Sequence, residues 1–263
     1  HAMLGEGGSS REELSIMHTN IVAFRRLTLG MTPEKMIEWL NRYFGSMSEI
    51  IEKNGGFVDR LAGDSITAFW NAPRRTPKHP VVAALSALEQ IRLLDSEVAE
   101  EWELHYGARP RCRIGLHLGQ AIVGNIITGK RTFYTALGED VSLTTTLEEI
   151  NKVFKTHIII SEPFFRQLDA RFICRPLERI LHGEKRQALT LYELVEERDR
   201  LKAARILFHE EFSRMTATYW KKEFMQALSM CENMDTDEPA VKLYIKRCKI
   251  MIVMVQTDPN AHR

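Results

Sequence analysis

Between residues 14 and 194, short apolar runs suited to strands alternate with longer stretches whose apolar residues recur at helical spacing. The first of these helices is predicted to open at Thr32-Pro33, a capping residue followed by proline, and to stop at Asn54-Gly55-Gly56. Two strands then follow across a hairpin-like turn. This order of strand, helix, strand and strand predicts an α+β sandwich, in which helices cover one mainly antiparallel sheet.

The same patterns assign the remaining elements. We expect strands at residues 14–21, 57–60, 65–70, 113–117, 121–126, 157–160, 172–181 and 188–194. We expect further helices at residues 81–102, 140–153 and 162–168. Leu118-Gly119-Gln120 is interpreted as a break between two of the strands.

Beyond Glu196 only helical patterns remain, at residues 198–215, 218–230 and 240–255. The last two resemble a tetratricopeptide-type helical hairpin, although an ordinary pair of amphipathic helices explains them equally well. We therefore divide the chain into a tag or flexible linker (1–10), a main α+β domain (11–197) and a helical extension (198–263).

Composition excludes several classes of function. The 36 Lys and Arg residues nearly balance the 35 Asp and Glu residues, so no global field attracts nucleic acid. The four cysteines show no CxxC spacing and are interpreted as reduced thiols. No apolar run approaches the roughly 18 residues of a membrane span. We expect a cytoplasmic domain, or the cytosolic part of a membrane-anchored protein whose sensor or membrane segment lies upstream.

Several separate strings, in the right order, resemble the catalytic domain of class III adenylate and guanylate cyclases, the bacterial adenylate cyclase type in particular. They are Leu40-Asn41-Arg42-Tyr43-Phe44, residues 51–59, Gly63-Asp64, residues 114–119, residues 123–126, Tyr134-Thr135-Ala136-Leu137-Gly138 and Leu147-Glu148. The resemblance implies the fold of that family, a ferredoxin-like βαββαβ palm. The same strings also serve as plain scaffold, with glycines in turns and apolar residues in a sheet.

In the family two aspartates hold two Mg²⁺ or Mn²⁺ ions, which activate the ribose hydroxyl and neutralise the triphosphate. The resemblance places the second aspartate at Asp64 and the first at Asn20, with the backbone carbonyl of Ile21 as a further ligand. Asn20 has no charge, and one unit charge at about 4 Å is worth about 4 kcal/mol at an effective dielectric of about 20. We expect metal affinity to fall sharply, and Asp64 is equally well read as a turn aspartate.

Nucleotide contacts are implied at three further positions. The base-reading positions of the family correspond to Arg60 and Thr135, and Lys185 lies where a family lysine meets the triphosphate. Arg60 favours adenine over guanine if it reads a base, but its planar fork is not equivalent to lysine. Solvated surface charges are the alternative interpretation of Arg60 and Lys185.

The transition-state positions of the family, an Asn and an Arg, correspond to Ser142 and Thr146. Losing a phosphate-directed arginine costs about 10³ to 10⁵ in rate, and losing one preorganised donor about 10² to 10³. The resemblance also implies a head-to-tail homodimer that shares each site between two chains.

These substitutions predict a catalytically degenerate cyclase-homology domain, which serves dimerisation or signal relay and retains weak binding of an ATP-like nucleotide. Two alternatives stay open. One is an active adenylate cyclase with an atypical site, which converts ATP to cyclic AMP and diphosphate. The other is an interaction scaffold whose C-terminal helices bind a partner.

Overall fold

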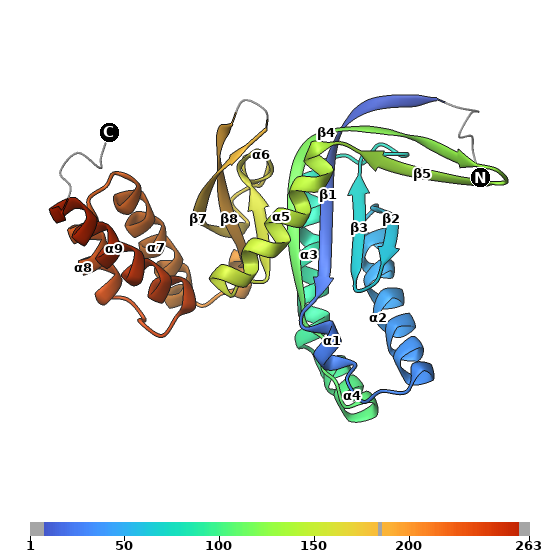
Figure 1. Cartoon of the computed structure of the whole chain (residues 1–263), viewed down its shortest axis with the longest axis horizontal. Helices are drawn as coiled ribbons and strands as arrows, with labels where there is room; N and C mark the ends of the chain where they lie inside the picture. Colours follow the sequence, from blue (N-terminus) through green and yellow to red (C-terminus); the bar gives the residue numbers. More distant parts are fainter. Residues whose placement is uncertain (1–7, 184–185, 258–263) are drawn as a thin grey trace.

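The computed structural model describes residues 8–183 and 186–257, which form one eight-stranded sheet with helices on its faces (Figure 1). Seven strands follow the order β2-β3-β1-β4-β6-β8-β7, and β5 pairs with β4. The strands are β1 (Ser9–Ile21), β2 (Phe57–Ala62), β3 (Ser65–Trp70), β4 (Cys112–Thr128), β5 (Arg131–Leu137), β6 (Ile158–Ser161), β7 (Phe172–His182) and β8 (Gln187–Glu197). The helices are α1 (Phe24–Leu27), α2 (Pro33–Lys53), α3 (His79–Asp95), α4 (Glu97–Tyr106), α5 (Glu139–Phe154), α6 (Glu162–Phe165), α7 (Ala203–Trp220), α8 (Phe224–Glu232) and α9 (Pro239–Thr257), with a 3₁₀ turn at Arg198–Arg200.

The predicted α+β fold class is confirmed. Strands β1 to β4, with α2 after β1 and α3 after β3, give the sheet order β2-β3-β1-β4 of a ferredoxin-like βαββαβ unit. All strand pairs are antiparallel except β4 with β6. The predicted start of α2 is also confirmed, since the Thr32 side chain accepts a hydrogen bond from the Lys35 amide at 3.4 Å.

Three details differ from the sequence prediction. Leu118-Gly119-Gln120 does not break a strand, because all three residues pair with β1 inside the continuous strand β4. The expected helix at 81–102 is two helices, because Ser96 between them has extended backbone angles (φ −85°, ψ 174°). The short helix α1 and the strand β5 were not predicted at all.

The main core lies between the sheet and the helices α2, α3 and α4. It is built around the fully buried rings of Trp39, Trp70 and Trp102. Apolar side chains of β1, β3 and β4 alternate with residues on the opposite face, as strand geometry requires. This packing fixes the ends of β1 and β2, where Asn20, Ile21 and Arg60 lie.

The C-terminal helices share a second apolar cluster with α5 and strands β6 to β8. Arg175 of β7 is 2% exposed and bonds Glu193 of β8 at 2.5 Å and Glu238, just before α9, at 2.6 Å. The Tyr244 hydroxyl of α9 donates to the Leu177 carbonyl at 2.8 Å. Helices α7 to α9 therefore cover one side of the β7–β8 hairpin, at the end of the molecule away from β2 (Figure 1). The domain limits at residues 10 and 197 stay predictions.

None of the helices in the described ranges combines the length and apolar character needed to cross a bilayer.

Candidate functional site

The end of β1 meets the turn between β2 and β3, and this junction holds the residues predicted to bind metal. The Ile21 amide donates to the Asp64 carbonyl at 2.9 Å, and Asn20 pairs with Ser65 in the β1–β3 ladder. Asn20, Ile21 and Asp64 line one cavity of about 500 Å³. The structure therefore brings the three predicted metal positions together.

The donor set at this junction does not fit a pair of divalent cations. Mg²⁺ and Mn²⁺ select hard oxygen ligands, and two bound ions need more than one carboxylate to balance their charge. Here Asp64 offers one carboxylate, while Asn20 offers a neutral amide oxygen and Ile21 a backbone carbonyl. Within residues 8–183 and 186–257, no three His, Cys, Asp or Glu side chains are grouped to hold a metal ion.

Two arginines that the sequence analysis did not single out border the same cavity. Arg25 and Arg26 belong to α1, which begins directly after Ala23. Ala23 has a left-handed backbone (φ 54°, ψ 36°), and its carbonyl accepts the amides of Arg26 at 2.8 Å and Leu27 at 3.0 Å. This turn carries the two arginines to the hollow beside Asn20 and Asp64. The adjacent pair of basic residues was the available sequence signal.

The predicted base-reading residues share a second cavity, of about 420 Å³. Arg60 from β2 and Thr135 from β5 both line it, with Phe57, Asp59 and Tyr134 beside them. Consecutive strand residues normally face opposite sides, but the β2–β3 register shifts between Val58 and Arg60. This bulge lets Asp59 and Arg60 border the same cavity.

Asp59 was not predicted as a site residue, yet it is the most buried carboxylate of this cavity, with a side chain 1% exposed. Its Oδ2 accepts a hydrogen bond from Arg60 Nε at 2.9 Å, and its Oδ1 is buried without a partner among the described residues. The Arg60 side chain is 51% exposed. Its terminal nitrogens therefore stay at the mouth of the cavity, where they can donate to a ligand.

The predicted transition-state positions lie apart from these cavities. Ser142 and Thr146 are exposed, four residues apart on α5, and line neither the metal-position cavity nor the base cavity. The Ser142 hydroxyl donates to the Gly138 carbonyl at 3.5 Å. Lys185 lies outside the described residues.

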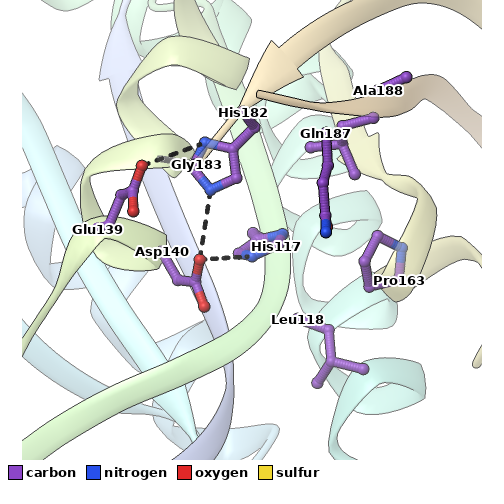
Figure 2. Close-up of a pocket in the computed structure, with 10 residues that line it drawn as sticks. His117, Leu118, Glu139, Asp140, Pro163, His182, Gly183, Gln187 and Ala188 are labelled. Carbon is purple, nitrogen blue, oxygen red and sulfur yellow. Dashed lines mark hydrogen bonds and ion pairs between the residues drawn. The ribbon is translucent and has the colours of Figure 1, made fainter. Parts of the chain in front are cut away.

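A cluster of two histidines and an aspartate, His117, His182 and Asp140, lines a third cavity of about 500 Å³ (Figure 2). Asp140 Oδ1 lies 3.4 Å from Nε2 of His117 and 3.4 Å from Nε2 of His182. On the far side of its ring, His117 Nδ1 lies 2.7 Å from the Ser161 hydroxyl. Gly119 is needed here, because a Cβ at that position would lie 2.3 Å from Asp140 Oδ2.

The sequence analysis did not predict this cluster. Its members come from β4, α5 and β7, so no local spacing in the sequence marks them. Burial alone would raise the pKa of Asp140, but hydrogen bonds from His117, His182 and the Gln120 amide outweigh it and lower the pKa to about 2. The carboxylate therefore stays charged and ties the tip of the β7–β8 hairpin to the start of α5.

Comparison with known proteins identifies the fold family. The family model for the adenylate and guanylate cyclase catalytic domain matches residues 8–194. Adenylate cyclase 1 of Rhizobium meliloti (strain 1021) is 31% identical over 188 residues, which are 70% of this chain and 28% of that protein. The terminal-differentiation-specific adenylate cyclase of Dictyostelium discoideum is 25% identical over 251 residues, which are 92% of this chain and 12% of that protein.

The chain thus spans less than a third of the length of either relative. Among solved structures, the adenylyl cyclase CyaB from P. aeruginosa superposes with a TM-score of 0.65 at 24% identity, covering 74% of this chain and all of that one. The family match extends over the whole sheet up to β8 and includes each cavity described above. The chain therefore belongs to the adenylate and guanylate cyclase catalytic domain family.

Proposed function

We propose that this chain is a catalytically degenerate cyclase domain, which binds a purine nucleotide weakly and acts in dimerisation or signal relay. The observation that carries the proposal is the exposed face of α5, which bears Ser142 and Thr146, the residues that the family resemblance assigns to the transition-state positions. Neither short hydroxyl side chain supplies the positive charge that stabilises a transferring phosphoryl group. The single carboxylate at the metal positions points the same way.

Nucleotide binding is supported by the base cavity. Arg60 offers guanidinium donors at its mouth, Thr135 offers a hydroxyl, and Phe57 and Tyr134 offer aromatic surface for a purine. Guanidinium and hydroxyl donors beside aromatic surface suit a purine nucleotide, and we propose an ATP-like one.

Pairing with a second copy is supported by the β4–β5 hairpin, which extends beyond the rest of the sheet (Figure 1). It carries exposed apolar side chains, namely Ile126 at 45%, Ile127 at 60% and Phe133 at 52% exposure. Ile126 and Phe133 pair directly across the two strands and therefore share one face, and exposed apolar surface of this kind supports a protein interface. We propose a head-to-tail homodimer in the cytoplasm, downstream of a sensor or membrane segment, with the tetratricopeptide-like C-terminal helices as a partner surface.

An active adenylate cyclase with an atypical site is the second candidate. It is favoured by the shared cavity of Asn20, Ile21 and Asp64, which leaves donors for one cation. Class III cyclases in general use Mg²⁺ or Mn²⁺, so both ions belong in the assay. The donor set does not fit the two-ion site, so this candidate needs a site with a single cation.

The two candidates are separated by measuring cyclic AMP formed from ATP by the purified chain with Mg²⁺ and with Mn²⁺. We expect the wild type to match the Asp64→Ala variant at the background rate. Wild-type turnover well above that variant would refute the degenerate domain and support the atypical cyclase. As a positive control, the triple variant Asn20→Asp/Ser142→Asn/Thr146→Arg should gain turnover, since it restores the missing chemistry on the same scaffold.

A further inference from the structure

We propose that Arg25 and Arg26 bind the polyphosphate of a nucleotide directly, without a divalent cation, in the cavity at the end of β1. The inference rests on the proposed nucleotide binding and names the groups that hold the phosphates. It follows from the mismatch between this cavity and a metal pair. The ligand class is a polyphosphate anion, either free or as part of a purine nucleotide.

The position of the two arginines is the first argument. Both line the cavity that Asn20, Ile21 and Asp64 also line, and both side chains are exposed to it. The left-handed turn at Ala23 and the hydrogen bonds to its carbonyl fix the backbone on which they stand. In the part of the chain that the structure describes, neither guanidinium forms an ion pair. Their donors are therefore available to a ligand.

Charge is the second argument. Two guanidinium groups face one carboxylate in this cavity, so the local balance is positive. A positive site repels a divalent cation and attracts a phosphate chain. Guanidinium also matches phosphate oxygens in a planar two-bond geometry, with charge-assisted hydrogen bonds. The arginines thus supply the positive charge that two metal ions supply to a triphosphate.

The neutral Asn20 fits the same scheme. A second carboxylate at that position would cancel the remaining positive balance and repel the phosphates, whereas an amide adds a hydrogen-bond donor. Asp64 is then the one unfavourable charge in the site. Its removal should strengthen binding of the anion, while removal of a metal ligand should weaken it.

The test measures binding of inorganic tripolyphosphate and of a non-hydrolysable ATP analogue by isothermal titration calorimetry, in EDTA and then in Mg²⁺. We expect both to bind in EDTA and to compete with each other. Arg25→Gln/Arg26→Gln should weaken both by roughly tenfold or more, because it removes two charge-assisted contacts. The control Arg74→Gln/Arg214→Gln removes the same charge from exposed positions outside the cavity and should leave binding unchanged.

Asp64→Asn gives the deciding sign. We expect it to tighten tripolyphosphate binding in EDTA by roughly threefold, since a like charge is removed at a partly exposed site. The inference is overturned if either ligand binds only with Mg²⁺, if Arg25→Gln/Arg26→Gln binds as the wild type does, or if Asp64→Asn weakens binding. Cyclic AMP production by the wild type would refute the degenerate-domain proposal alone, because these binding measurements do not depend on turnover.

Discussion

His209 should make the stability of this protein depend on pH below neutrality. The side chain lies in α7, is 2% exposed, and has both ring nitrogens buried without partners among the described residues. Burial, followed by the charges of Arg175 and Arg205, lowers its pKa to about 3. The imidazole is therefore neutral in the folded protein, whereas its unfolded pKa is 6.5.

The sign and size of the effect follow from these two values. Between pH 6.5 and about pH 3 the unfolded chain binds one more proton at His209 than the folded chain. The free energy of unfolding should then fall by about 1.4 kcal/mol for each pH unit below 6.5, or about 2 kcal/mol at pH 5. Above pH 7 the imidazole is neutral in both states, so His209 no longer changes the free energy of unfolding with pH.

The perturbation is His209→Gln, which keeps a polar side chain of similar size and removes the titration. We expect the variant and the wild type to differ little at pH 8, and the variant to gain about 2 kcal/mol relative to the wild type at pH 5. Urea unfolding followed by circular dichroism between pH 5 and pH 8 measures this difference. Parallel curves for the two proteins across that range would refute the reasoning, because other titrating groups affect both equally.

Four further changes test the packing. Gly115→Ala places a Cβ 2.2 Å from a backbone oxygen of α5, so the melting temperature should drop in line with a loss of about 3 kcal/mol. The matched change Gly45→Ala, in open space on α2, should raise the melting temperature in line with a gain of about 0.5–1 kcal/mol, and equal effects of the two changes would contradict this reasoning. Asp140→Asn should lower the free energy of unfolding, measured in urea at pH 7, by about 2 kcal/mol. The difference from the wild type should shrink as the pH falls from 3.8 towards 2, because the wild-type carboxylate then becomes protonated. Arg175→Ala removes the buried ion-pair partner of Glu193 and Glu238, whose side chains are each 14% exposed, and should lower the unfolding free energy by about 3 kcal/mol, while a loss under 1 kcal/mol would show that the ion pairs are not needed.

Most strands and helices, though not α1 or β5, could be read from the sequence because period and caps are local properties. Thr32-Pro33 and the Gly55-Gly56 stop fixed α2 without reference to the rest of the chain. The predicted strand break at Gly119 was wrong, because this glycine lies within β4 and makes room for the Asp140 side chain of α5. A contact between two distant elements leaves no spacing in the sequence.

Some residues of the candidate site could be located from the sequence, and others only from the structure. The family resemblance located Asn20, Asp64, Arg60 and Thr135, and the structure brings them into two cavities. Sequence patterns did not show that Arg25 and Arg26 border the first cavity, since a four-residue helix has too few turns to display a period. The β-bulge that lets Asp59 and Arg60 border the same cavity is likewise a property of strand pairing.

The apolar cluster shared by α5, the β7–β8 hairpin and the C-terminal helices bears on how the chain folds during synthesis. The cluster around α2, α3 and β1 to β4 needs no residue beyond β8, so it can close early on the ribosome. The second cluster waits for α9, because Tyr244 and Val241 complete it. Until then the sheet edge at β7 lies beside an uncovered apolar surface, which invites association with other chains. We expect a nascent chain that stalls between β8 and α9 to be the form most in need of a chaperone.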